Sequence, residues 1–314
     1  MTSPGTPPAA PAQEQAPTQG TAFSFGTRFA AAMDEHGPLC VGIDPHAALL
    51  DAWGLPDTAA GVREFSLRVV EACGPHAAAL KPQAAFYERH GSAGIAALED
   101  TLAAARAAGV LTIVDAKRGD IGSTMAAYAD AYLRDGSPLA GDALTVNPFL
   151  GLGSLDPAAE LAADTGRGLF LLCLTSNKEG PDVQHARLAR HGRRHDDPDG
   201  AQQVTVAAYI ASYAAALNAL SSPLGSVGLV VGATVGDAVA AAGVDLVAAN
   251  APILAPGVGA QGAGAAELAA TFGEARGRVC ASSSRSILAA GPDATALRAA
   301  ACAAADDARH ALRG

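Results

Sequence analysis

Four charged side chains fall within six residues of a chain in which only 17% of the residues are charged. They are Asp115, Lys117, Arg118 and Asp120, in the segment VLTIVDAKRGDIGST at residues 110–124. The segment opens with apolar residues typical of a buried strand, so the charges gather where that strand ends. Buried charges persist when they are paired, and acid–base chemistry needs such groups at fixed positions. This segment is therefore the first candidate for an active site.

Strand geometry predicts that Asp115 and Lys117 point to the same side. Successive side chains on a strand alternate in direction, which places these two roughly 6.5 Å apart along it. Lys81 ends the preceding predicted strand and is expected beside Asp115. The result is an alternating set of Lys81, Asp115, Lys117 and Asp120. A salt-bridge cluster without catalytic function is an alternative, and a metal held by the two aspartates is disfavoured because a lysine lies between them.

Short apolar runs separated by Ala-rich stretches are the elements that must position these charges. Eight runs are predicted as strands, at residues 39–44, 78–82, 111–117, 141–147, 168–176, 227–233, 252–257 and 279–284. Helical spacing between them places Val62, Phe65 and Val69 on one side of a helix, and a second helix is expected to end at Gly109. For the seventh strand the alternative VDLVAA, at residues 244–249, stays open. Eight strand–helix units whose strands are apolar on both faces predict a parallel sheet.

The ends of these strands favour a closed (β/α)8 TIM barrel, in the α/β class, over an open doubly wound sheet. No GxGxxG follows the first strand, where the sequence is GIDPH. Polar residues occur at the carboxyl end of most strands: Asp44, Lys81, Asp115, Lys117, Asn147, Ser176 and the run from Ser282 to Arg285. A barrel collects these ends in one ring, which is where active sites of such barrels lie.

Composition narrows the class of protein. Residues 1–21 are rich in Pro, Ala and Gln and predict a disordered tail, which leaves residues 22–314 for one barrel domain. The sequence contains no uninterrupted run of 18 apolar residues, the length that a membrane-spanning helix needs. Its formal charge of −10 argues against nucleic-acid or anionic-membrane partners. The five cysteines are scattered, and three of them (Cys40, Cys173 and Cys280) lie in predicted strands. This pattern indicates a reducing compartment and hence the cytoplasm.

A polar segment interrupts the pattern between the fifth predicted strand and its helix. Residues 184–200, QHARLARHGRRHDDPDG, contain His185, His191 and His195. Metal ligation by these histidines is conceivable, but a solvated insertion is the favoured interpretation because most residues of the segment are polar.

Several segments resemble the orotidine 5'-phosphate decarboxylase family, in its longer bacterial branch. The signature is DAKRGDIG at residues 115–122. It is accompanied in order by GIDPH (42–46), LKPQAAFYE (80–88), VNPFLG (146–151), LTSN (174–177), APGVGAQG (255–262) and SSSR (282–285). The resemblance spans most of the chain after the tail and implies the eight-unit barrel fold.

The resemblance implies removal of carbon dioxide from orotidine 5'-monophosphate to give UMP, with no metal or organic cofactor. Lys117 resembles the acid that protonates C6 of the pyrimidine, and Asp115 the carboxylate beside the substrate's own carboxylate. Lys81 and Asp44 match positions that hold the ribose hydroxyls and orient the charged network. Independently of any family, a fixed ammonium group is the natural stabiliser of a carbanion, and a neighbouring carboxylate favours its charged form.

The remaining implied contacts concern a partner chain, the base and the phosphate. Asp120, Ile121 and Thr124 match residues that enter the site of a neighbouring subunit, so a homodimer with shared sites is expected. Ser176 matches the serine that contacts the pyrimidine edge. Gln261 and Arg285 match the residues that hold the phosphate, and the loop at 257–262 is expected to close over it. Glycine-rich backbone and a planar guanidinium both suit an anion at this place in a barrel.

Three other functions are compatible with a barrel that carries a strand lysine. A Schiff-base aldolase needs a lysine of lowered pKa, whereas the aspartates near Lys117 act in the opposite direction. A non-catalytic nucleotide-binding barrel has no need of alternating acids and lysines. A magnesium-dependent sugar-phosphate decarboxylase of the same superfamily is the closest alternative, and sensitivity to EDTA would distinguish it.

Overall fold

A computed structural model describes residues 23–188, 204–258 and 263–313 of the chain. In these ranges eight parallel strands form one sheet, in the order β2-β1-β8-β7-β6-β5-β4-β3. The strands are β1 (Leu39–Ile43), β2 (Ala79–Pro82), β3 (Ile113–Arg118), β4 (Ala143–Val146), β5 (Gly168–Leu174), β6 (Val227–Val231), β7 (Ile253–Pro256) and β8 (Val279–Ser283). Isolated parallel bridges, Leu80 to Thr112 and Gln83 to Asp115, join β2 to β3. The predicted TIM barrel is confirmed, while the predicted tail at 1–21 lies outside the described residues.

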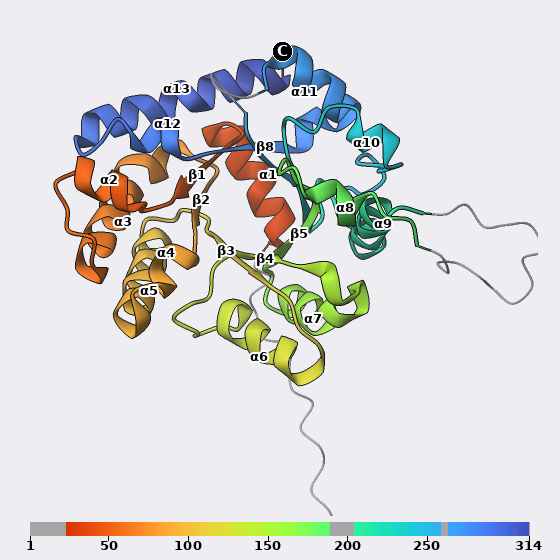
Figure 1. Ribbon diagram of the computed structural model, residues 1–314, viewed down its shortest axis with the longest axis horizontal. Helices are drawn as coiled ribbons and strands as arrows, with labels where there is room; N and C mark the ends of the chain where they lie inside the picture. The colour runs from red at the N-terminus through yellow and green to blue at the C-terminus, as the bar shows by residue number, and fades with distance from the viewer. Residues whose placement is uncertain (1–22, 189–203, 259–262, 314) are drawn as a thin grey trace, which may run out of the picture.

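Helices surround this ring of strands (Figure 1). They are α1 (Phe25–His36), α2 (Ala47–Ala52), α3 (Ala59–Cys73), α4 (Ala85–Glu88), α5 (Gly91–Ala107), α6 (Gly122–Leu133), α7 (Asp156–Asp164), α8 (Gly180–Gln184), α9 (Val206–Asn218), α10 (Ala238–Ala241), α11 (Ala265–Phe272), α12 (Arg285–Leu288) and α13 (Ala294–Arg313). Single 3₁₀ turns cover Gly74–His76, Pro148–Leu150, Leu152–Leu155 and Gly273–Arg278. The long α13 lies along the outside of the barrel, next to β8 and β1.

Apolar side chains on the predicted helix faces form the layer between strands and helices. Val62, Phe65 and Val69 of α3 are fully buried, as their spacing predicts. The second predicted helix ends where expected, because Gly109 adopts a positive φ of 73° that stops helical hydrogen bonding. The seventh strand is the PILAPG segment, and the alternative at 244–249 lies in turns. Strand positions read from the sequence therefore hold to within about two residues.

One end of the barrel is covered by α1, which crosses the ring in Figure 1. Phe25, Phe29 and Met33 recur every fourth residue, so they share one helical face, and all three are buried. They pack in one cluster with Phe170 of β5, and the rings of Phe25 and Phe170 meet edge to face with centroids 5.9 Å apart. A Cβ at Gly168 would lie 2.3 Å from the Phe25 ring, so only glycine leaves room for this contact. The opposite end of the barrel is left open.

Candidate active site at the barrel mouth

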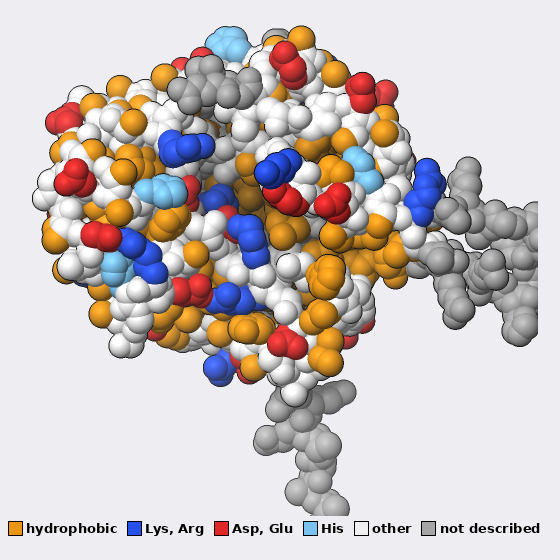
Figure 2. Space-filling model, in the orientation of Figure 1, with side chains coloured by type: hydrophobic (Ala, Val, Ile, Leu, Met, Phe, Trp, Pro, Cys, Tyr) orange, Lys and Arg blue, Asp and Glu red, His pale blue; other side chains and the backbone are white. Residues whose placement is uncertain are grey.

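The carboxyl ends of the strands surround a cavity of about 730 Å³. Figure 2 shows it as a hollow near the centre of this face, with Lys and Arg side chains at its edge. Five residues singled out in the sequence line it: Asp44, Lys81, Asp115, Lys117 and Arg285. They come from the ends of β1, β2, β3 and β8. The fold therefore brings together residues that are up to 241 positions apart in the chain.

Asp115 is the centre of a hydrogen-bonded network at the floor of this cavity. Its Oδ2 atom accepts from Lys81 Nζ at 2.9 Å and from Gln83 Nε2 at 3.1 Å. Its Oδ1 atom accepts from Lys117 Nζ at 2.5 Å and from Thr145 Oγ1 at 2.9 Å. The predicted alternation of Lys81, Asp115 and Lys117 is thus present as two ion pairs on one carboxylate.

Burial and charge act in opposite directions on this network. Burial alone raises the pKa of the Asp115 carboxyl, but the ammonium groups of Lys81 and Lys117 outweigh it and lower that pKa well below its usual range. Burial likewise lowers the pKa of Lys81, while Asp115 and Asp44 outweigh it and raise that pKa above the usual value. Asp115 is therefore an anion and Lys81 a cation throughout the neutral range.

The two lysines differ in access to the cavity. The side chain of Lys81 is 9% exposed and that of Lys117 is 44% exposed, so Lys117 is the more accessible of the two to a ligand. Lys117 also has an unusual backbone, with a φ of 47°. The pairing of β3 with β4 shifts register between Val114 and Arg118, which is a β-bulge. Bulges re-aim side chains next to active sites, and here the bulge brings Lys117 back onto Asp115.

Asp44 and Ser284 each bring an unsatisfied oxygen to the cavity wall. Asp44 Oδ1 and Ser284 Oγ are buried and have no hydrogen-bond partner among the described residues. Both lie close to Gly42, where a Cβ would come within 3.1 Å of Asp44 Oδ2 and 3.3 Å of Ser284 Oγ. Hydroxyl groups of a ligand could satisfy such a carboxylate, because buried polar atoms are normally hydrogen-bonded.

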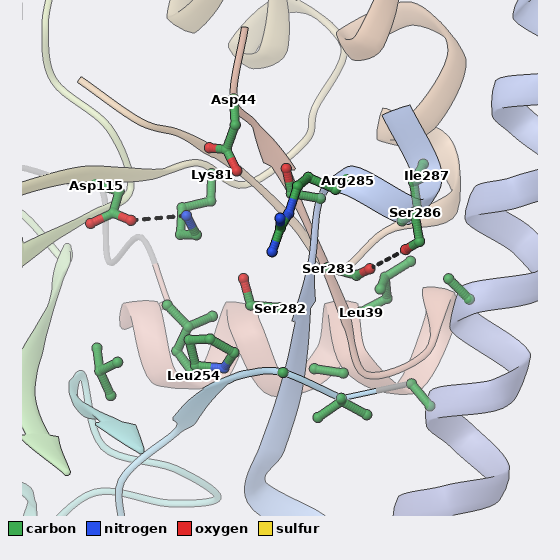
Figure 3. Close-up of a pocket in the computed structure, with 18 of the residues that line it drawn as sticks. Leu39, Asp44, Lys81, Asp115, Leu254, Ser282, Ser283, Arg285, Ser286 and Ile287 are labelled. Atoms are coloured by element: carbon green, nitrogen blue, oxygen red, sulfur yellow. Dashed lines mark hydrogen bonds and ion pairs between the residues drawn. The ribbon is translucent and has the colours of Figure 1, made fainter. Parts of the chain in front are cut away.

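Arg285 supplies an uncommitted positive charge at the other side of the cavity. It follows β8 as the first residue of α12, and Figure 3 shows its side chain reaching towards Lys81 and Ser282. In the described part of the chain no hydrogen bond or ion pair involves its guanidinium group. A free, planar donor of this kind suits a phosphate or carboxylate. Gln261, the other residue predicted to hold phosphate, lies outside the described residues together with Gly259, Ala260 and Gly262.

Four predicted site residues are not in contact with this network. Asp120 Oδ1 accepts from the amide of Ile121 at 2.8 Å, and within the described ranges no hydrogen bond joins Asp120 to Lys117. Ile121 and Thr124 are exposed at the start of α6. Ser176 is exposed just after β5, where the neighbouring Thr175 lines the cavity instead. The roles predicted for these residues remain predictions.

The polar insertion is described only at its edges. Gln184 ends α8 and its Oε1 atom accepts from the amide of Thr175 at 2.9 Å, so the segment begins by packing beside the cavity. His185 is partly buried, whereas His191 and His195 lie outside the described residues. Among the residues with described positions, no group of three His, Cys, Asp or Glu side chains could hold a metal ion.

Gln83 and Thr145 are the site residues that the sequence did not reveal. Gln83 follows Lys81 by two residues, so the period of a strand places both on one side of β2, which is a usable signal. Thr145 lies inside the apolar run of β4 and resembles an ordinary core residue until β3 and β4 are paired.

No helix of the described chain is both long and apolar enough to cross a membrane.

Comparisons with known proteins agree on one family. The profile of the Orotidine 5'-phosphate decarboxylase / HUMPS family matches residues 37–300. The chain is 54% identical over 291 residues to a Salinispora arenicola protein named orotidine 5'-phosphate decarboxylase, covering 93% of the chain and 99% of that protein. A Streptomyces coelicolor protein of the same name is 55% identical over 277 residues, covering 88% of the chain and 94% of that protein.

Solved structures give the same result for the fold. A crystal structure from Streptomyces avermitilis, of a protein assigned as an orotidine 5'-phosphate decarboxylase, superposes with a TM-score of 0.86 at 53% identity, covering 96% of the chain and all of that protein. The structure of Leishmania donovani OMP decarboxylase gives a TM-score of 0.68 at 30% identity, over 93% of the chain and 100% of that protein.

Proposed function

The chain belongs to the orotidine 5'-phosphate decarboxylase / HUMPS family, and we propose from this premise how its residues carry out the reaction. The activity is the decarboxylation of orotidine 5'-monophosphate to UMP and carbon dioxide, a step of pyrimidine biosynthesis. The observation that supports our assignment of roles is that Lys81 and Lys117 both form ion pairs with the buried carboxylate of Asp115 at the floor of the cavity. Arg285, whose guanidinium group has no partner among the described residues, lies at the side of the same cavity.

Lys117 is the group that stabilises and protonates the carbanion. Loss of carbon dioxide leaves negative charge on a pyrimidine carbon with little resonance stabilisation, so a positive charge already in place lowers the barrier without reorganisation. The ammonium group of Lys117 is held 2.5 Å from Asp115 and faces the cavity. It can also deliver the proton that replaces the carboxylate, as a general acid does. Asp115 and Lys81 fix its position and keep the site electrically balanced.

The other side chains bind the parts of the nucleotide that do not react. Arg285 holds the phosphate, with Gln261 and the loop at 257–262 as its partners. Asp44 and Lys81 accept from and donate to the ribose hydroxyls, which would satisfy the unpaired oxygen of Asp44. Ser176 contacts the pyrimidine edge. Phosphate binding remote from the reacting carbon supplies energy that aligns the base with Lys117.

We also propose a homodimer whose sites are shared. Three large apolar side chains are exposed near the mouth: Ile121 at 62%, Phe149 at 73% and Leu150 at 53%. They follow β3 and β4, with Ile121 directly after Asp120 in the chain, and a second copy of the chain would bury them. The described bond of the Asp120 side chain is to the amide of Ile121 and no described bond joins it to Lys117, which fits a role with Ile121 and Thr124 in the site of the partner.

Two broader proposals concern the whole chain. Residues 22–314 act as one catalytic domain, because the single sheet runs from β1 to β8 and each strand needs its neighbours. The protein works in the cytoplasm, which fits five free cysteines of which four are buried in the barrel and its helices.

The proposal is tested by following the absorbance of orotidine 5'-monophosphate with purified protein in EDTA. We expect the wild type to retain full activity and Lys117→Ala to lose about 10⁴-fold in kcat, the upper range for removing a general acid. Lys178→Ala is the matched control, because Lys178 is the remaining lysine of the chain and its side chain is 91% exposed.

Other outcomes would favour other chemistry. Loss of wild-type activity in EDTA would indicate a metal-dependent decarboxylase. Covalent trapping by borohydride with a carbonyl substrate would indicate a Schiff base at a lysine. Equal turnover by Lys117→Ala and Lys178→Ala would remove Lys117 from the proposed role.

A further inference from the structure

The hydroxyl of Thr145 connects the two residues on which the proposed reaction depends. Thr145 lies on β4, is 1% exposed and lines the floor of the cavity. Its Oγ1 atom donates to Asp115 Oδ1 at 2.9 Å. The same atom accepts from the backbone N–H of Lys117, also at 2.9 Å. The buried hydroxyl oxygen of Thr145 therefore fixes one carboxylate oxygen of Asp115 and the backbone of Lys117, two residues further along β3.

The backbone at Lys117 needs such support. A φ of 47° places a residue with a Cβ in the left-handed region, which is strained and persists only when the surroundings enforce it. The β3–β4 ladder is interrupted at this point and resumes with Arg118 opposite Val146. The N–H of Lys117 is therefore directed to a side chain, Thr145, in place of a strand partner.

We propose that Thr145 is a positioning residue that holds the Lys117 ammonium at the reacting carbon by fixing the bulge of β3 and one oxygen of Asp115. This inference rests on the proposed function of Lys117. Thr145 does not touch the substrate carbon itself, and it exchanges no proton in the reaction. Its effect is on geometry that exists before the nucleotide binds, so it should alter turnover more than binding.

Thr145→Val removes the hydroxyl while keeping the branched shape of the side chain. The N–H of Lys117 then loses its partner in a partly buried place, and Asp115 keeps only its bonds to Lys81, Gln83 and Lys117. We expect kcat to fall about 10-fold, the effect of one buried hydrogen bond, with KM and the affinity for UMP within about 2-fold of wild type. Thr145→Ser retains the hydroxyl and should restore kcat to within about 3-fold of wild type.

Thr101→Val is the matched control. Thr101 is also 1% exposed, and its hydroxyl donates at 2.7 Å to Ala97 O inside α5, away from the cavity. A purely structural effect of losing a buried hydroxyl would lower stability in both variants and leave kcat unchanged in both. If Thr145→Val folds poorly, its kcat is measured at reduced temperature per mole of folded protein, where the same loss is expected.

The outcomes separate this inference from the function beneath it. A wild type that fails to decarboxylate orotidine 5'-monophosphate overturns the proposed function, and the inference with it. An active wild type whose Thr145→Val variant matches Thr101→Val in kcat overturns the inference alone. A 10-fold loss in kcat that Thr145→Ser fails to restore also overturns it, because the hydroxyl would then not be the responsible group.

Discussion

At the scale of single residues, the site is built around one carboxylate. The chain contains only three lysines, and two of them form ion pairs with Asp115. Two cations on one anion leave a net positive charge at the floor of the cavity. This arrangement suits a substrate that arrives with a carboxylate and a phosphate and passes through a carbanion. The guanidinium of Arg285, which has no ion-pair partner among the described residues, adds to the same charge.

The lowered pKa of Asp115 predicts an acid-dependent contribution to stability. An unfolded Asp has a pKa of about 3.9. The pKa of the folded Asp115 carboxyl is lower because Lys81 and Lys117 stabilise its anion. Its stabilisation is therefore complete above the unfolded pKa and is lost as the pH falls through that value towards the folded one. Asp115→Asn should lower the free energy of unfolding by about 3–5 kcal/mol at pH 7, because it leaves buried Lys81 without its countercharge.

Guanidinium unfolding at neutral pH and near pH 3 measures this. The difference between wild type and Asp115→Asn should shrink at the lower pH, because the unfolded wild-type carboxyl binds a proton there that the folded carboxyl does not. Asp135→Asn is the control, because its side chain is 79% exposed and its surface pair with Arg167 contributes about 0–1 kcal/mol. A difference that stayed constant across pH would mean that the charge of Asp115 is not what stabilises the fold.

Sequence reasoning located the charged residues because their pattern is local. Asp115 and Lys117 share the side of a strand, and Lys81 ends the strand before it, so their meeting follows from a parallel barrel. The bulge that turns Lys117 into the left-handed region has no local signal, since neither glycine nor asparagine marks it. Thr145 was missed for the same reason, as its function depends on the register between β3 and β4.

At the scale of elements, one end of the barrel is open and the other is closed by a helix. The carboxyl ends of the strands carry the cavity, while the other end is filled by the apolar face of α1. Phe25 and Phe29 stack with centroids 5.2 Å apart and both meet Phe170 edge to face. The ion pair of Arg28 with Asp142, at 2.5 Å, ties the helix to the turn before β4. A filled base keeps the strands that carry the site from moving apart.

Removing one aromatic ring from this base should destabilise the barrel without altering its chemistry. Phe29→Ala is expected to lower the free energy of unfolding by about 3–5 kcal/mol, because Phe29 is fully buried and the surrounding rings cannot collapse into the space. Denaturant unfolding measures the loss, and kcat at low temperature should stay within about 2-fold of wild type. Phe23→Ala is the control, since Phe23 is 73% exposed and should change stability by less than about 0.5 kcal/mol. Equal stability of the two variants would show that α1 does not support the barrel.

The elements themselves were largely predictable. Apolar runs gave all eight strands, since strands buried on both faces leave a continuous hydrophobic signature. The helical face of α1 is also readable from Phe25, Phe29 and Met33, but nothing in its spacing tells that it lies under the barrel. That placement depends on side chains from β5 and on the small residue at Gly168, which only the assembled sheet brings near.

At the scale of the whole molecule, the charge distribution bears on binding of the nucleotide, and the exposed apolar surface bears on contact with a second copy of the chain. The net charge of −10 opposes anions in general, so binding of a nucleotide depends on the local cations of the cavity. Beside that cavity, Ile121, Phe149 and Leu150 form an apolar rim that a monomer would leave in water. The proposed symmetric dimer would bury the same patch on both copies and would bring each Asp120 towards the other chain.

Shared sites make a prediction that separate sites do not. Lys117→Ala and Asp120→Ala each inactivate a homodimer, because every site lacks either its own lysine or the aspartate of its partner. In a mixed dimer, the subunit that keeps Lys117 receives Asp120 from the Lys117→Ala subunit, so one of the two sites is complete. Mixing the purified variants under conditions that exchange subunits should therefore restore activity.

Sedimentation tests whether the protein is a dimer. Mixing Lys117→Ala with Asp115→Asn is the control, because both changes affect the same half of the site and one subunit cannot correct the other. Restored activity in the first mixture alone supports a site built from two chains, and no recovery in either would confine Asp120 to a structural role in its own subunit.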